Sequence, residues 1–202
     1  MGRSIWDRFS PIYDVSETVY NGSVYNATGE RVAEYIYPCD EVLECACGTG
    51  AISVYIASKC KRLTATDMSE GMLRQAERKL KNRYNVRLRK ADITHLKCRD
   101  GSYDKVVAGN VIHLLDDPEG AVRELMRVCK PGGKVIIPTY INESKLTSRA
   151  AVGVIRKFGV DFKKSFTLDS YKQFFADMGY DNAEFTLVNG RMPCAIAVIT
   201  KE

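Results

Sequence analysis

The sequence predicts an α/β fold, in which strands and helices alternate along the chain and the strands join in one open sheet. A short apolar run, Glu41–Glu44, leads into the small residues of Cys45–Gly50 and then into a helix. Two further strand-like runs, Arg62–Asp67 and Val86–Asp92, each end in an acid. A buried strand, a tight glycine turn and a helix N-terminus, in this order, are typical of the nucleotide-binding corner of such a sheet.

The glycine turn indicates which kind of cofactor fits. Gly48 and Gly50 let the backbone approach a ligand without a Cβ in the way. Dinucleotides place their phosphates at this helix N-terminus, where the carboxylate of Glu44 would repel them. Ser53 also replaces the third glycine of the dinucleotide motif. A cationic cofactor without phosphate, such as S-adenosylmethionine, fits better; the alternative is a tight turn that holds no ligand.

The later elements continue the alternation. A fourth strand is expected over Tyr103–Gly109, and Pro118 suits the first position of a helix that ends near Lys130. Pro138 lies in the fifth strand and predicts the point where pairing stops, because proline has no amide to donate. The other expected elements are helices over 50–59, 69–83 and 167–178, a strand over 134–140, and a C-terminal hairpin of 182–189 and 192–200.

Two segments are less regular. Residues 1–40 predict an aromatic, helical N-terminal cap, with Thr28–Tyr37 as its second helical piece. Its aromatic side chains either pack or lie over the mouth of the cofactor site. Residues 141–166 are expected to form a substrate-side segment. Within it, a helix over Lys145–Phe158 would cover a substrate pocket or touch a membrane surface.

Composition favours one domain over residues 1–202. The chain has 45% hydrophobic residues and no apolar run as long as a membrane span. Seven scattered cysteines and the absence of a signal-peptide pattern indicate reduced thiols and a cytoplasmic location. Net charge is +5, and many cations lie in Arg74–Lys90. We interpret this stretch as a solvated helix face rather than a nucleic-acid patch.

Two acids are candidate ligands of a nucleoside. Asp67 ends the second strand, about twenty residues after the glycine turn, where a carboxylate accepts both ribose hydroxyls. The alternative for Asp67 is a helix N-cap. Asp92 ends the third strand, where it is placed to accept the exocyclic amine of adenine while Ile93 covers the ring.

Five motifs follow one another along the chain: Glu-Cys-Ala-Cys-Gly-Thr-Gly (44–50), Asp-Met-Ser-Glu-Gly-Met-Leu (67–73), Lys-Ala-Asp-Ile (90–93), Tyr-Asp-Lys-Val-Val (103–107) and Val-Cys-Lys-Pro-Gly-Gly-Lys-Val (128–135). They resemble the motifs of class I S-adenosylmethionine-dependent methyltransferases, over about residues 38–200. Within that family they are most similar to the motifs of the ubiquinone/menaquinone C-methyltransferase branch. The resemblance implies a three-layer α/β/α Rossmann-like sandwich with a seven-stranded, mostly parallel sheet of order 3-2-1-4-5-7-6.

The resemblance also implies the roles of individual residues. Glu44 would lie near the methionine amino group of the cofactor, and Asp67 would hold the ribose. Tyr13 would close the site from the N-terminal segment. The cofactor-binding set implied by the resemblance is Tyr13, Glu44, Ala46, Gly48, Gly50, Asp67, Met68, Asp92, Ile93 and Asn110.

His113 is the candidate catalytic residue, because a neutral imidazole can take a proton from an acceptor. The alternatives are that it orients the substrate or simply packs. No His/Cys/Asp cluster indicates a metal. The expected reaction is methyl transfer to a small molecule by in-line displacement. Alternatives are an RNA or protein methyltransferase that uses the basic 74–90 stretch, and a cofactor-binding module without catalysis.

Overall fold

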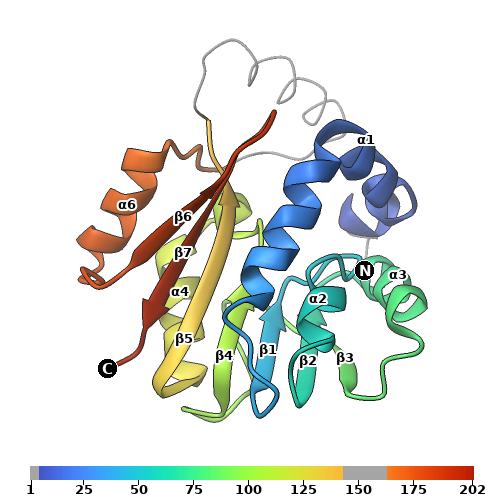
Figure 1. Cartoon of the computed structure of the whole chain (residues 1–202), viewed down its shortest axis with the longest axis horizontal. Helices are drawn as coiled ribbons and strands as arrows, with labels where there is room; N and C mark the ends of the chain where they lie inside the picture. Colours follow the sequence, from blue (N-terminus) through green and yellow to red (C-terminus); the bar gives the residue numbers. More distant parts are fainter. Residues whose placement is uncertain (1–4, 143–162) are drawn as a thin grey trace.

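The computed structural model describes residues 5–142 and 163–202, and within these it is a three-layer α/β/α structure. Figure 1 shows α1 and α2 in front of the sheet and α4 behind β4 and β5. The strands are β1 (Glu41–Cys45), β2 (Arg62–Asp67), β3 (Val86–Lys90), β4 (Tyr103–Ala108), β5 (Cys129–Tyr140), β6 (Glu184–Val188) and β7 (Cys194–Thr200). The helices are α1 (Ile5–Ala33), α2 (Ser53–Ala57), α3 (Glu70–Leu80), the 3₁₀ turn η1 (Ile112–Leu114), α4 (Pro118–Val128) and α6 (Leu168–Asp177).

The sheet confirms the expected fold class and strand order. Its seven strands run β3-β2-β1-β4-β5-β7-β6. The pairs from β3 to β5 are parallel, and β7 pairs antiparallel with both β5 and β6. The C-terminal hairpin therefore supplies strands six and seven, as expected. The carboxyl ends of the parallel strands meet at one edge, where ligands of open α/β sheets bind.

Two clusters of buried side chains hold the layers together. The front cluster packs α1, α2 and α3 against the sheet, and includes Ile36, Ile56 and Leu63. The rear cluster packs α4 and α6 against it, and includes Leu125 and Phe175. Both helices of the rear layer begin at side-chain caps: Asp117 accepts from Gly120 N in α4, and Thr167 forms a capping box with Ser170 in α6.

Pro138 does not end the pairing of β5, so that expectation is wrong. β5 continues to Tyr140, and Pro138 lies opposite Ile196 in the ladder with β7. The carbonyl of Pro138 accepts a hydrogen bond from Asn110 N (2.8 Å). The nitrogen of a strand residue points to the same side as its carbonyl. Because β4 has already ended at Ala108, no ladder partner on that side needs an amide donor from Pro138.

Helix α1 consists of two helical pieces that meet at a kink, as expected, but the kink lies before Thr28, where the second piece was expected to begin. Asn21 has non-helical dihedrals (φ −142°, ψ 28°) inside it. The Asn21 side chain donates to Met192 O (2.9 Å) and accepts from Met192 N (3.4 Å), which ties the kink to the loop between β6 and β7. Gly190 in that loop is in such close contact with α1 that a Cβ there would come within 2.1 Å of Val24 Cγ2.

Several expectations concern residues that the structure does not describe. The helix expected over Lys145–Phe158 and most of the substrate-side segment 141–166 lie outside the described residues. Among the residues that are described, no helix combines the length and apolarity needed to cross a bilayer. The same residues contain no group of three or more His, Cys, Asp or Glu side chains that could hold a metal ion. All seven cysteines are free, and five of them are buried.

Candidate functional site

The turn between β1 and α2 adopts left-handed backbone conformations at three positions. Ala46 (φ 52°), Gly48 (φ 54°) and Gly50 (φ 82°) all have positive φ. A Cβ at Gly48 would meet open space, whereas one at Gly50 would lie 3.3 Å from Ala76 of α3. Gly48 therefore borders the cavity next to the turn, and Gly50 permits the close approach of α3. Ala46 is a non-glycine residue in a region that is costly for a side chain.

A cavity of about 520 Å³ opens at the carboxyl ends of β1 to β4. Seven of the predicted site residues line it: Ala46, Gly48, Asp67, Met68, Asp92, Ile93 and Asn110. Sequence reasoning missed the other side of the cavity, which Val111, Leu114, Leu115, Asp116 and Asp117 provide. The signal for these residues was their position directly after the fourth strand.

Asp67 joins the glycine turn to the start of α3. Its Oδ2 accepts from Gly48 N (2.9 Å) and its Oδ1 accepts from Ser69 N (2.8 Å). Ser69, not Asp67, caps α3, because its hydroxyl accepts from Met72 N. Burial raises the pKa of Asp67 above its usual value, although the backbone amides act in the opposite direction. A carboxylate fixed in this way at the cavity can accept hydrogen bonds from ligand hydroxyls.

Asp92 and Ile93 form the wall next to β3. Oδ1 of Asp92 accepts from the amide (2.9 Å) and the hydroxyl (2.7 Å) of Thr94. These bonds, the amide bond most of all, hold the pKa of Asp92 below its usual value, so it is ionised at neutral pH. Ile93 is buried and apolar, whereas Met68 is 59% exposed on the cavity rim. An acceptor beside an apolar surface suits a flat heterocycle with an amino group.

Asn110 lines the cavity and carries a buried, unsatisfied acceptor. Its backbone is left-handed (φ 53°), and its N donates to Pro138 O. Its Oδ1 is buried and has no hydrogen-bond partner within the described part of the chain. Burying a polar atom without a partner costs on the order of 1–3 kcal/mol, so a ligand donor at this point would be stabilised.

Glu44 lies beneath the turn and does not line the cavity. It is 2% exposed, and Ser53 Oγ donates to its Oε2 at 2.5 Å. Burial raises the pKa of Glu44 to about 8; the Ser53 bond lowers it and the charge of Asp67 raises it further. The sequence reasoning treated Ser53 only as a missing glycine, and did not identify it as the donor to this acid. A cation near Glu44 would favour the ionised carboxylate.

His113 is also buried and outside the cavity lining. It belongs to η1, is 4% exposed, and its carbonyl accepts from Lys164 N (3.1 Å). Burial lowers the pKa of His113 to about 4, so its imidazole is neutral at pH 7. Tyr13 belongs to α1, but its side chain lies outside the described residues.

The N-terminal helix is attached to the cavity region by Asp7, which sequence reasoning did not single out. Oδ1 of Asp7 accepts from Ser69 Oγ (2.7 Å) and from Gly71 N (2.8 Å) at the start of α3. The approach is so close that a Cβ on Gly71 would lie 2.9 Å from Asp7 Cα. An acid is favourable at this position, because the helix N-terminus carries unpaired amides and a partial positive charge.

S-adenosylmethionine fits these residues in its polar and apolar parts. The cavity volume falls in the range of small-molecule sites. Asp67 offers a carboxylate for ribose hydroxyls, Asp92 and Ile93 offer an acceptor and an apolar face for adenine, and the orphaned Asn110 Oδ1 can accept from an ammonium. The β1–α2 turn presents Gly48 to the cavity, and the described residues that line this cavity include no Lys or Arg side chain.

Several known proteins that are similar to this chain are methyltransferases. The family model for a methyltransferase domain matches residues 43–137. A demethylmenaquinone methyltransferase of Clavibacter sepedonicus is 31% identical over 137 residues, covering 66% of this chain and 56% of that protein. A phosphatidylethanolamine N-methyltransferase of Cereibacter sphaeroides is 30% identical over 151 residues, covering 73% and 72%. The chain spans 56%, 60% and 57% of the length of the first three curated relatives.

Solved structures agree on the fold. A possible histamine N-methyltransferase from Thermotoga maritima superposes with a TM-score of 0.75 at 20% identity, covering 98% of this chain and 99% of the other. At this identity the likeness concerns the fold alone. The fold described above is therefore shared with a known solved structure.

Proposed function

We propose that this chain, which belongs to the class I S-adenosylmethionine-dependent methyltransferases, transfers a methyl group to a small-molecule acceptor. Membership of the family confirms the resemblance that the motifs indicated, and S-adenosylmethionine is the cofactor of that family. The acceptor and the reaction itself are our proposal. Its main support is one observation: Asn110, whose Oδ1 is orphaned, lines the cavity together with the fixed Asp67 and Asp92.

In this proposal the residues of the cavity bind and orient. S-adenosylmethionine supplies a methyl group on a sulfonium, which the acceptor takes by in-line displacement. Asp67 holds ribose hydroxyls, and Asp92 with Ile93 holds the adenine. Asn110 Oδ1 accepts from the ammonium of the cofactor, and Glu44 supplies negative charge beneath the turn. Alignment and exclusion of water are the main contributions of these residues to the rate.

The acceptor side is proposed to be partly apolar. Val111, Leu114 and Leu115 line the cavity beyond Asn110. Residues 141–166 and the N-terminal cap, including Tyr13, would complete this side as parts of the single domain 1–202. The curated relatives named above act, by their names, on demethylmenaquinone and phosphatidylethanolamine, which are molecules with large apolar parts. A cytoplasmic location remains a prediction of the sequence.

The catalytic role of His113 remains a prediction. Its surroundings indicate whether it would act as a base or as a positioning residue. It is buried, and η1 connects it to Asn110 on one side and to Leu115 on the other. A pKa of about 4 makes its imidazole a weak base. Orientation of the 110–115 loop is the role that this geometry favours.

Calorimetry and product analysis test the proposal together. We expect S-adenosylhomocysteine to bind the purified chain and NADH not to bind. We expect S-adenosylhomocysteine to form when S-adenosylmethionine is incubated with a demethylmenaquinol analogue or a phosphatidylethanolamine. Binding without product on any acceptor would instead indicate a non-catalytic module. NADH binding in place of S-adenosylhomocysteine would overturn the assignment of the cavity.

A further inference from the structure

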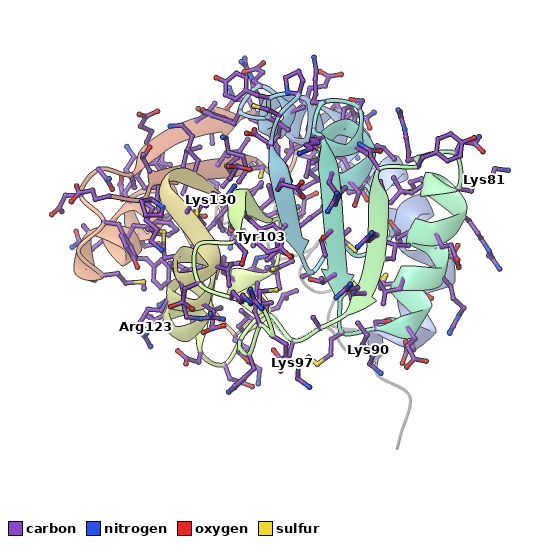
Figure 2. All side chains as sticks on the ribbon, turned by 90° about the horizontal axis from the view of Figure 1, so that it is seen from below. Lys81, Lys90, Lys97, Tyr103, Arg123 and Lys130 are labelled. Carbon is purple, nitrogen blue, oxygen red and sulfur yellow. The ribbon has the colours of Figure 1, made fainter. Side chains whose placement is uncertain are left out.

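The rear face of the sheet is covered only in part. The rear cluster under α4 and α6 takes buried residues from β1, β4, β5 and β7, but none from β2 or β3. The chain passes from β3 to β4 through residues 91–102, which form no helix. Figure 2 shows the result: β1, β2 and β3 lie side by side with no helix of the described residues crossing in front of them.

The residue pattern of β2 and β3 is that of strands with one face open to solvent. A sheet layered on both sides by helices is apolar on both sides. In β2 and β3 the front face is apolar and the rear face is polar, with the rear positions filled by arginine and threonine. The front residues are Leu63, Ala65, Val86 and Leu88, and the rear residues are Arg62, Thr64, Thr66, Arg87 and Arg89.

A groove of about 710 Å³ lies on this open face. Its floor is formed by Thr64 and Thr66, and Tyr103 stands at one side, as Figure 2 shows. Lys90 and Lys97 lie near one end of the strands. Four residues line both this groove and the cofactor cavity, so the two are continuous: Met68, Ala91, Asp92 and His95.

The groove is cationic, and part of its charge is uncompensated. Five Arg or Lys side chains line it, against two carboxylates, Glu41 and Asp92. Arg62 lies 3.7 Å from Glu41, and Lys90 pairs with Glu70 at 2.8 Å. No carboxylate of the described residues pairs with the exposed arginines of β3, or with Lys97. An anion from outside the chain would therefore meet three unpaired cations: Arg87, Arg89 and Lys97.

We propose that this groove binds the phosphate backbone of a single-stranded nucleic acid. Guanidinium groups take phosphate oxygens two at a time, and the Tyr103 ring offers a surface for a base. A groove on one face of the sheet suits a single strand, which is narrower and more flexible than a duplex. An acidic protein surface is less well matched, because stable protein interfaces need buried apolar or aromatic anchors at their centre. This inference revises our interpretation of the 74–90 cations, and it does not depend on methyl transfer.

Fluorescence anisotropy with labelled dodecamers of uridylate and of thymidylate tests the proposal. With three phosphate contacts, we expect the affinity of the wild type to fall about 20-fold between 50 and 200 mM salt. The double variant R87A/R89A should weaken binding at least tenfold and reduce the slope of log affinity against log salt by about 1.4. The matched control R31A/K172A removes the same charge from α1 and α6, and should bind as the wild type does.

Other outcomes overturn the inference. If R87A/R89A and R31A/K172A weakened oligonucleotide binding equally, the protein would attract the oligonucleotide by its overall charge and not at a defined site. If the wild type bound polyglutamate as tightly as the oligonucleotides, and R87A/R89A lost this binding, the groove would be a binding surface for an acidic protein. Because Arg87 and Arg89 are exposed, we expect unchanged circular dichroism, and R87K/R89K provides a second variant that keeps the charge. Calorimetry with S-adenosylhomocysteine should be unaffected in all of these variants, which separates this test from that of the proposed function.

Discussion

The hydroxyl of Ser53 donates a hydrogen bond of 2.5 Å to Oε2 of the buried Glu44. Among the described residues, no Lys, Arg or His forms an ion pair with this acid. One hydroxyl does not offset the burial of a full charge, which is why the pKa of Glu44 rises to about 8. The chain thus carries an acid that is largely neutral until a cation arrives. The ammonium of the proposed cofactor is such a cation.

We predict that E44Q changes the pH dependence of stability. A carboxyl whose pKa is raised on folding binds more protons in the folded state, so its contribution to stability is complete below pH 4.5 and is lost as pH rises to about 8. E44Q removes this loss, so the variant should exceed the wild type in stability at pH 8.5 by on the order of a few kcal/mol, since each pKa unit is worth about 1.4 kcal/mol. Urea denaturation at pH 5 and 8.5 measures this. A wild type as stable at pH 8.5 as at pH 5 would contradict it.

We predict that D67A weakens binding of S-adenosylhomocysteine by about 1–3 kcal/mol, the size of a lost buried hydrogen-bonding group. The carboxylate is held in place by Gly48 N and Ser69 N. Calorimetry gives the affinity, and the melting temperature shows how much of the effect comes from the loss of these two acceptors. The exposed acid Asp181 provides the control, D181A. Equal affinity in D67A and the wild type would leave Asp67 a structural residue of the turn.

The sequence was sufficient to predict the elements and the acids at the strand ends, because these depend on local periodicity and on turn residues. It did not predict which side chains reach the cavity. Gly50 belongs to the same turn as Gly48, and Glu44 belongs to the strand that leads into it, yet both face the packed interior, Gly50 toward α3 and Glu44 toward Ser53. Those directions depend on the position of α3 and on the left-handed backbone of Ala46, which no local pattern reveals.

The open rear face illustrates the same limit. The alternation in β2 and β3 was present in the sequence, but a helix over residues 91–102 would have covered it. Only the three-dimensional arrangement shows that no helix lies there. For the same reason the cations of 74–90 were interpreted as one helix face, although they divide between α3 and the rear side of β3.

We predict that A46G stabilises the protein by on the order of 1 kcal/mol. Ala46 has φ 52°, where a residue with a side chain loses about 1–2 kcal/mol and glycine loses none. Part of this gain is offset, because glycine has more conformational freedom to lose on folding. The matched variant G48A introduces the same strain at φ 54°, with its methyl group facing the cavity. G48A should therefore lower both the melting temperature and cofactor affinity. A lower melting temperature for A46G would show that the turn does not relax as expected.

We predict that G190A destabilises the protein and that V24A partly rescues it. A Cβ at Gly190 would come within 2.1 Å of Val24 Cγ2, so the loop between β6 and β7 would have to shift away from α1. Overpacking of this kind costs about 1–3 kcal/mol. In G190A/V24A the clash is gone, so the double-mutant cycle should give a coupling of about 1 kcal/mol or more. Additive losses would mean that the loop already has room for the methyl group.

We predict that H113A lowers turnover and leaves the affinity for S-adenosylhomocysteine unchanged. His113 does not line the cavity, so cofactor contacts survive its loss, whereas the 110–115 loop that orients the acceptor side rests on it. The pH profile distinguishes two roles. A base with a pKa of about 4 would give activity that rises between pH 3 and 5 in the wild type and loses this step in H113A. If His113 is a positioning residue, H113A should lower kcat at every pH with the profile unchanged. H113N, which keeps a planar polar side chain, should then recover part of kcat. Wild-type turnover in H113A would remove His113 from both roles.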